Sequence, residues 1–366
     1  MDYFKTYVSN TTAGSGNQFF FHNEAEGSTR SRTFYRAECG GEYPYSFLFS
    51  NTIDSTFRDG SVSRKNLVMD PWCIEEMRVG VTPFCEGASF REPAEMKPVL
   101  FDGQGKKEVE PGALFHTDPV TLKAKQGEYI CVEIVFSGKR IPYHKESKIP
   151  SFVLTEAGWT PSKEHPFVSM VGIRRTPKMK IGFLGDSITQ GIGPPTNSYA
   201  HWNAVLADLL GKDFAYWNLG IGSARGDDAA SDGIWLYKAK QNHVVFVCFG
   251  INDILQGFSA EEVKKNLQTI VDLLSEAGVR VIVQTAPPFD FADEKRARWE
   301  EINRFIMKEL KGAELVFDCA KLLAKSEDEP HLQAYGKHPN AEGCRLWGEA
   351  LFRTVKPILL GDDLVL

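Results

Sequence analysis

The chain has 366 residues, which is long enough for two domains that each bury a core of their own. Its hydrophobic and charged fractions, 42% and 25%, are those of an ordinary globular protein. The formal net charge is -6, and no long run of lysine and arginine offers a basic face. We therefore expect no nucleic-acid partner.

The first residues, MDYFK, lack the basic start and the apolar core of a secretory signal. No stretch approaches the roughly 20 apolar residues that a membrane span requires. The seven cysteines are an odd number without close paired spacing, which indicates reduced thiols and no metal site. We expect a cytoplasmic protein with no membrane contact and no cofactor, and the sequence leaves the oligomeric state open.

Up to about Thr176 the pattern is that of β-strands, because long helical periodicity is missing and glycine turns separate short apolar runs. Apolar side chains at every second position from Ile130 to Phe136 have the period of a strand with one buried face. We predict an all-β, jelly-roll-like sandwich domain over residues 1–176.

From Lys178 onward, apolar runs alternate with helical segments. Strands are predicted at 181–184, 215–219, 244–249, 279–284 and 315–317, and helices at 199–210, 227–240 and 260–276 and from about 293 and 341. Such alternation predicts parallel strands covered by helices, in a second domain over residues 177–366. The segment after Ser259 is the clearest helix, because Ser259 and Glu262 can form a capping box and Gly278 can end it.

The run Lys178–Gly191, KMKIGFLGDSITQG, ends its apolar strand at Gly185 and continues into Asp186 and Ser187. Open α/β sheets bind ligands at the carboxyl ends of their strands, so Ser187 is a candidate nucleophile. A helix N-cap is the alternative role for a serine at this place. A serine hydroxyl also needs a base and donors for the oxyanion.

Groups of the required kinds follow later strand ends. The run from Val244 ends in Gly250-Ile251-Asn252-Asp253, which places a side-chain amide there, and Trp217–Ser223 reads WNLGIGS. Farther on, Gly336-Lys337-His338-Pro339-Asn340 places an imidazole just before a helical stretch. Serine, glycine turn, asparagine and histidine thus occur in this order.

The four segments GDSITQG, NLGIGS, GIND and KHPN resemble the four blocks of the SGNH/GDSL hydrolase family, which implies a flavodoxin-like three-layer α/β/α domain with a parallel sheet. The resemblance implies that Ser187 attacks an ester carbonyl and that His338 is the base. It implies an oxyanion hole made of the backbone N–H groups of Ser187 and Ser223 and the amide of Asn252. The region before it has a looser resemblance to the β-domain of some bacterial SGNH esterases.

Two positions depart from the family pattern. In the second block, the family usually has glycine five residues after the asparagine, and here the residue five positions after Asn218 is Ser223. Serine can supply the backbone N–H if its dihedral angles are ordinary, and Gly222 is the fallback donor. The aspartate that normally stands three residues before the histidine is Tyr335. A backbone carbonyl, Asp318 or the acidic cluster 327–329 could orient the imidazole instead, and we favour a Ser-His dyad that uses a carbonyl, as in some SGNH carbohydrate esterases.

These features predict a carboxylic ester hydrolase that works through an acyl-enzyme. A carbohydrate O-acetyl ester is the first expected substrate, because of the β-domain, and a lipid-type acyl ester, as for a lipase or lysophospholipase, is second. A thioester or an aryl ester follows. The alternative from another class is a carbohydrate-binding protein that kept the fold and lost catalysis with its aspartate.

Overall fold

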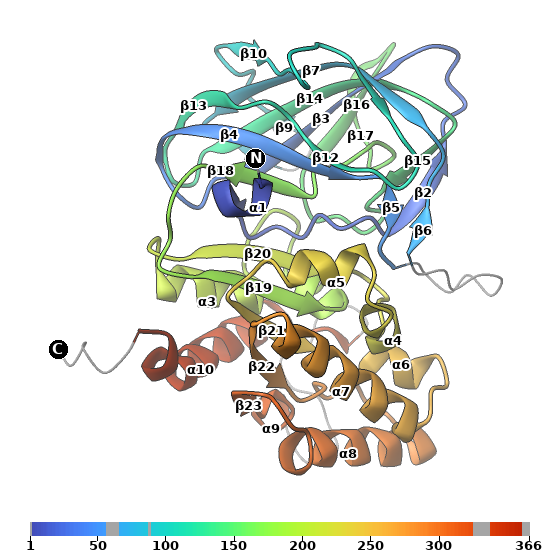
Figure 1. Ribbon diagram of the computed structural model, residues 1–366, viewed down its shortest axis with the longest axis vertical. Coiled ribbons are helices and arrows are strands. Elements are labelled where there is room, and N and C mark those ends of the chain that lie inside the picture. Colours follow the sequence, from blue (N-terminus) through green and yellow to red (C-terminus); the bar gives the residue numbers. More distant parts are fainter. Residues whose placement is uncertain (1, 56–65, 87–88, 325–336, 361–366) are drawn as a thin grey trace. The chain divides into compact units, whose positions relative to one another are not determined.

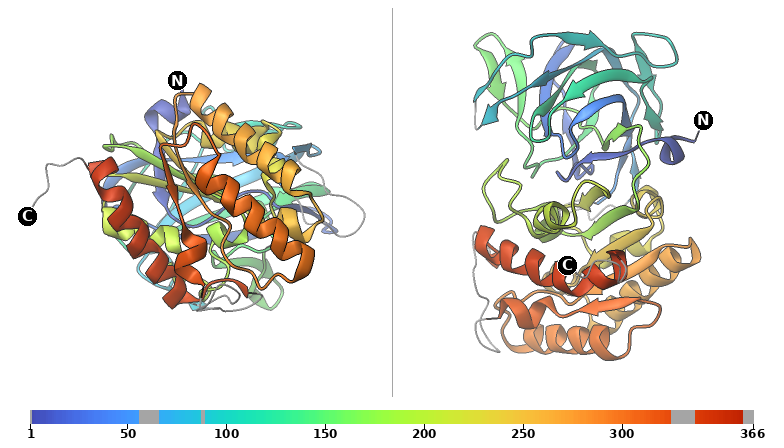
Figure 2. Two further views of the ribbon diagram at one scale, coloured as in Figure 1. Left: turned by 90° about the horizontal axis from the view of Figure 1, so that it is seen from below. Right: turned by 90° about the vertical axis from the view of Figure 1, so that its left-hand side faces the viewer.

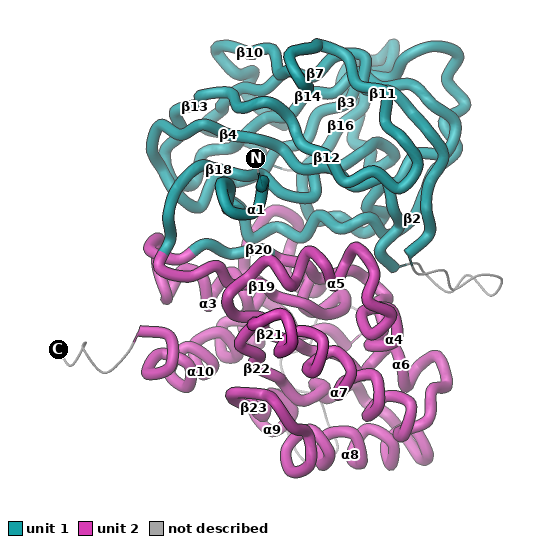
Figure 3. The backbone as a smooth tube through the Cα atoms, viewed as in Figure 1, with its two compact units in different colours: residues 1–177, 215–217 teal, residues 178–214, 218–366 magenta. Residues whose placement is uncertain are grey.

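The computed structural model describes residues 2–55, 66–86, 89–324 and 337–360 (Figure 1). The chain forms two compact units, residues 1–177 with 215–217 and residues 178–214 with 218–366 (Figure 3). The first is rich in strands and the second alternates strands with helices, so the expected fold class is confirmed. The domain boundary expected between residues 176 and 177 stays a prediction.

Two antiparallel sheets form most of the first unit. One has the order β12-β4-β18-β1 with β13 also on β4, and the other has the order β10-β7-β14-β3-β16-β17 with β11 also on β7. Asn10 and Thr11 of β1 also pair in parallel with Tyr216 and Trp217. The elements are α1 (Tyr3–Thr6), β1 (Val8–Thr11), β2 (Phe19–His22), β3 (Thr29–Arg36), β4 (Gly41–Ser50), β5 (Thr52–Ile53), β6 (Leu67–Val68), β7 (Trp72–Thr82), β8 (Cys85–Glu86), β9 (Ser89–Phe90), β10 (Met96–Pro98), β11 (Lys107–Val109), β12 (Leu114–His116), β13 (Val120–Ala124), β14 (Tyr129–Ser137), β15 (Arg140–Tyr143), β16 (Ser151–Thr155), β17 (Gly158–Pro161) and β18 (Met170–Ile173).

Strand β14 is buried on both faces. Its alternate apolar residues from Ile130 to Phe136 are almost fully buried, as the period of two predicts. Cys131 and Glu133, on the opposite face, are buried as well. Phe34 and Phe152 pack with Cys131 in a second apolar cluster, which explains why this face is covered.

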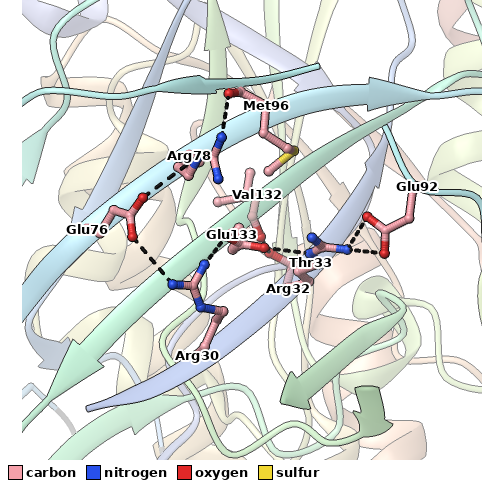
Figure 4. A network of polar contacts seen from close by, with 9 residues as sticks. All are labelled: Arg30, Arg32, Thr33, Glu76, Arg78, Glu92, Met96, Val132 and Glu133. Carbon is pink, nitrogen blue, oxygen red and sulfur yellow. Dashed lines mark hydrogen bonds and ion pairs between the residues drawn. The ribbon is translucent and has the colours of Figure 1, made fainter. Parts of the chain in front are cut away.

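The Glu133 carboxylate is accommodated there by two arginines of β3 (Figure 4). Arg30 donates to Oε1 at 2.6 Å and Arg32 donates to Oε2 at 2.7 Å. Arg32 also binds Glu92, and its guanidinium lies 4.3 Å from the ring centre of Trp159. A buried carboxylate without such partners would be strongly destabilising, so the network makes the burial of this face tolerable.

The second unit is built on a sheet with the order β20-β19-β21-β22-β23. Numbered along the chain this order is 2-1-3-4-5, the flavodoxin-like arrangement, and β19, β21, β22 and β23 pair in parallel. Helix α3 packs against α10, and α7 packs against α4 and α8 (Figures 1 and 2). The elements are β19 (Lys180–Gly185), α2 (Ser187–Gln190), α3 (Trp202–Leu210), β20 (Ala215–Gly220), α4 (Gly226–Ala230), α5 (Ile234–Ala239), β21 (Val244–Cys248), α6 (Ile251–Leu255), α7 (Ala260–Glu276), β22 (Arg280–Gln284), α8 (Asp293–Lys308), β23 (Leu315–Phe317), α9 (Cys319–Leu323) and α10 (Ala341–Leu360).

Helix α7 confirms its sequence signals. Ser259 and Glu262 form the capping box, and Gly278 follows the helix with φ 78°. The single helix expected over 227–240 is wrong, because α4 and α5 are separated at Asp232, whose φ is 52°, and Gly233. The helix expected from residue 199 begins at Trp202, because Tyr199 has φ 52° and His201 is the N-cap.

The seven cysteines are free thiols and all of them are buried. Within the described ranges, no helix is both long and apolar enough to cross a membrane. Those same ranges hold no group of three or more His, Cys, Asp or Glu side chains placed to bind a metal ion.

Candidate active site

Ser187 is the first residue of α2, directly after β19. Asp186 is the N-cap of this short helix, and its Oδ1 accepts the N–H of Ile188 at 2.9 Å. A side chain at Gly185 would place its Cβ 2.2 Å from Thr189 Oγ1 and 2.7 Å from Cys248 O. Only glycine fits this close turn, so the strand end fixes where the serine hydroxyl lies.

His338 meets Ser187: the serine Oγ and the histidine Nε2 lie 2.7 Å apart. The two residues are 151 positions apart in the chain and were expected together from the sequence. At this distance the imidazole can accept the hydroxyl proton, which is the geometry that an activated serine requires.

The segment that carries His338 is held by contacts on several sides. The ring of Phe289 packs edge-on against the imidazole with centroids 6.1 Å apart. Lys337 Nζ and Asp290 Oδ2 form an ion pair of 2.5 Å. A Cβ at Gly193 would lie 2.0 Å from Pro339 O, so this glycine permits a close backbone approach.

The candidates for a group that orients His338 are only partly described. Tyr335 and the acidic cluster 327–329 lie outside the described residues. The hydrogen bonds of Asp318 are instead to Lys321 N at 3.1 Å and Thr285 Oγ1 at 3.2 Å, since it caps α9. Its contacts within the described part of the chain do not include His338, so the dyad remains a proposal.

Asn252 lies on α6, which follows β21, and Ser187 lies on α2, which follows β19. The strand order of the sheet reverses between these two neighbouring strands. Its Nδ2 donates to Ala224 O at 2.9 Å. An amide nitrogen carries two protons, so this bond orients the group and leaves a second donor. Gly250, before the helix, has φ 126°, a conformation that glycine adopts readily.

The glycine block forms a tight turn from Ile221 to Ala224, closed by the bond from Ala224 N to Ile221 O at 3.2 Å. Ser223, at the third position, has φ 62°. The condition of ordinary dihedral angles is therefore not met, because a type II turn demands positive φ at this position and usually has glycine there. The Ser223 N–H remains a backbone donor, since the orientation of the central peptide of the turn sets its direction, so its role in the oxyanion hole stays a prediction. The fallback donor Gly222 gives its N–H to Gln190 Oε1 at 2.6 Å.

Two buried acids next to these groups cap backbone N–H groups. Burial raises the pKa of Asp186 to about 7, and the N–H of Ile188 offsets this only in part. Burial likewise raises the pKa of Asp253 to about 6, although both of its oxygens accept from Gly226 N at 3.1 Å. These bonds place the two acids in the framework around Ser187 and Asn252.

The sequence reasoning missed Gln190, whose side chain joins the serine helix to the glycine turn. It also missed the buried ion pair between Arg225 and Asp228, in which Nη2 and Oδ1 lie 2.5 Å apart. Gln190 stands in the block GDSITQG, between Thr189 and Gly191, and nothing in that stretch of sequence reveals that only 2% of it is exposed.

The GDSL-like Lipase/Acylhydrolase family matches residues 183–346, a range that contains Ser187, Ser223, Asn252 and His338. An arylesterase of Vibrio mimicus is 29% identical over 110 residues, which are 28% of this chain and 52% of that protein. The chain thus spans about half the length of this relative.

Solved structures with a similar fold include the psychrotrophic esterase EstA of a Pseudoalteromonas species, with 19% identity and a TM-score of 0.41, covering 50% of this chain and 98% of that one. The acetyl xylan esterase AlAXEase has 21% identity and a TM-score of 0.40, and covers 48% of this chain and 99% of that one. The family match and the four blocks agree in place and order, so residues 183–346 of this chain are similar to the GDSL-like lipase/acylhydrolase family.

Proposed function

We propose that the protein hydrolyses carboxylic esters through an acyl-enzyme. The single observation that carries this proposal is the 2.7 Å contact between Ser187 Oγ and His338 Nε2. An intact pair of this kind favours an enzyme over the carbohydrate-binding protein that the loss of the aspartate suggested. The family that residues 183–346 match supports the same reaction class.

In the proposed reaction, His338 Nε2 takes the proton of Ser187 as Oγ forms a bond to the ester carbonyl carbon. The backbone N–H groups of Ser187 and Ser223 and the second amide proton of Asn252 stabilise the negative oxygen. The bond to the alcohol then breaks, and the alcohol leaves with the proton from His338. A water molecule then attacks the acyl carbon while His338 takes a proton from it. The bond between the acyl group and Ser187 Oγ breaks, the acid leaves, and His338 returns the proton to the serine.

The substrate class we propose first is an acetyl ester of a carbohydrate hydroxyl, because a β-rich unit precedes the hydrolase domain as in some esterases of this kind. An aryl ester gains support from the arylesterase of Vibrio mimicus. Initial rates with acetylated sugars, aryl acetates, a series of longer acyl chains and acyl thioesters would rank these classes. A preference that rises steadily with acyl length would contradict the carbohydrate proposal.

The decisive test is Ser187→Ala assayed with p-nitrophenyl acetate. We expect loss of turnover with an unchanged unfolding transition, and we expect a serine-directed phosphonate to label the native protein at Ser187. Full residual activity of the variant would remove the proposal. Failure of the phosphonate to label the folded native protein after prolonged exposure would favour a binding protein.

We also propose that His338 works in a dyad, oriented by a backbone carbonyl. Alanine substitution at Asp318 and at each of the acids 327–329 should leave most of the turnover. If one of these variants were as inactive as Ser187→Ala, that acid would be a third member of the site.

A further inference from the structure

The turn Ile221–Ala224 is held in a shape that its own sequence does not favour. Ser223 occupies the third position with φ 62°, a left-handed conformation that is unfavourable for a residue other than glycine. A type I turn would suit serine better, because both central residues then have negative φ. The two turn types differ by a rotation of the central peptide, the one that carries the Ser223 N–H.

The side chain of Gln190 is hydrogen-bonded to Gly222, the second residue of this turn. Its Oε1 accepts the Gly222 N–H at 2.6 Å, and its side chain is buried. The backbones also lie close, since a Cβ at Gly220 would fall 2.1 Å from Gln190 N. Because Gln190 is the last residue of α2, whose first residue is Ser187, its side chain ties the turn to the helix of the nucleophile.

Other bonds hold the two ends of the same turn. Ile221 N donates to Gly185 O at 3.1 Å, and Ala224 O accepts from Asn252 Nδ2 at 2.9 Å. Asn218 adds a further brace, because its Nδ2 donates to Gln190 O at 3.3 Å and its Oδ1 accepts from Gly220 N at 2.9 Å. The central peptide of the turn joins Gly222 to Ser223. Of the bonds named here, the one from Gly222 N–H to Gln190 Oε1 lies next to this peptide.

From this arrangement we infer that Gln190 is a positioning residue for the oxyanion hole: its side chain holds the turn in the form that directs the Ser223 N–H toward the substrate oxygen. This inference rests on the proposed function. Gln190 does not touch the reacting atoms, and it acts through the Gly222–Ser223 peptide. Without its acceptor, the turn can relax toward the form that serine prefers.

The test is Gln190→Met, which keeps the length of the side chain and removes the acceptor. Gln284→Met is the matched control, because Gln284 is also fully buried and its Oε1 accepts from Trp347 Nε1 at 2.7 Å. Loss of one oxyanion donor costs about 10²–10³ in kcat, and a misdirected donor costs part of that. We expect kcat for phenyl acetate to fall about 10- to 100-fold in Gln190→Met with KM within about threefold, and Gln284→Met to keep native kcat.

Phenyl thionoacetate separates positioning from general damage. Its sulfur accepts hydrogen bonds weakly and therefore gains little from the oxyanion donors. Gln190→Met should lose less than about threefold on this thionoester, so the ratio of kcat/KM for oxygen over sulfur should fall. An equal loss on both esters, or a loss equal to that of Gln284→Met, would overturn the inference.

The effect of Gln190→Met can also be measured in the variant Ser223→Gly, in which the turn is less strained and the protein is therefore easier to keep folded. Glycine adopts positive φ without strain, so the turn needs less external support. The fold-loss caused by Gln190→Met should therefore be smaller in this background than in the native chain, and an undiminished loss would count against the inference. If Ser187→Ala stays active, the proposed function fails; if it is inactive while Gln190→Met matches its control, only the role of Gln190 fails.

Discussion

The serine and the histidine of the site meet at 2.7 Å, but different kinds of structure hold them. On the serine side, β19, the buried cap Asp186 and the turn at Ser223 are joined by buried hydrogen bonds. On the histidine side, the described residues 337–340 are held by an aromatic contact, a close glycine and an ion pair whose two side chains are 43% and 50% exposed. The groups that stabilise charge are thus held by buried hydrogen bonds, whereas an exposed ion pair is among the contacts described beside the base.

Removal of the base should have the largest effect. His338→Ala is expected to lower kcat/KM for p-nitrophenyl acetate by at least about 10⁴-fold, because Ser187 would then lack a proton acceptor. The unfolding midpoint in urea should change little, since the side chain is only half-buried. Retention of activity within about 100-fold of native would show that another group is the base.

Asn252→Ala tests the serine side of the comparison. It removes one oxyanion donor and the bond to Ala224 O, so kcat should fall about 10²–10³-fold with a smaller change in KM. Asn242→Ala is a control for the loss of a buried amide, because Asn242 bonds to Lys238 O and Ala239 O in another part of the unit. If both variants lost the same activity, Asn252 would be structural.

Local signals were enough to predict the parts of the fold that depend on neighbouring residues. The capping box at Ser259, the strand that ends at Gly185 and the strand before Gly250 are written in short stretches of sequence. The resemblance to the four family blocks then predicted that Ser187 and His338 act together as nucleophile and base. The positive φ of Ser223 could not be predicted in this way, because the hydrogen bond that holds its turn is accepted by Gln190, a residue that is distant in the sequence.

The same limit explains why Gln190 was missed and why β14 is buried on both faces. Gln190 gains its role from Gly222, 32 positions away, and Glu133 can be buried because Arg30 and Arg32 lie on a neighbouring strand. Neither partner is visible in the periodicity of the segment itself. The residue that replaces the family's aspartate, Tyr335, lies outside the described part of the chain, so its prediction stays open.

The buried cap on the serine side should make stability depend on pH. The pKa of Asp186 is raised by burial to about 7, from 3.8, so the native state holds a proton that the unfolded state releases. The resulting stabilisation is complete below about pH 4 and is lost as the pH rises through 7, at about 1.4 kcal/mol per unit of pKa difference.

Asp186→Asn removes this dependence and keeps an oxygen that can accept the Ile188 N–H. The free energy of unfolding of the variant, relative to native, should therefore increase between pH 4.5 and pH 8 by a few kcal/mol. Urea unfolding at several pH values measures this difference. Asp232→Asn, at a side chain that is 46% exposed, is the control, and parallel pH profiles for Asp186→Asn and the native protein would contradict the prediction.

The smallest effect is expected at the ion pair beside the base. Lys337 and Asp290 both have positive φ, 66° and 58°, so their pairing joins two tight backbone turns. An exposed pair contributes only about 0.2–1 kcal/mol and is screened by salt. Lys337→Ala should therefore lower kcat less than about fivefold, and the difference from native should shrink as sodium chloride rises from about 0.05 to 1 M. Lys240→Ala, which breaks the ion pair with Asp232, should show no such change in kcat. A loss as large as that of Asn252→Ala would mean that the surface contacts preorganise the base as strongly as the core preorganises the oxyanion hole.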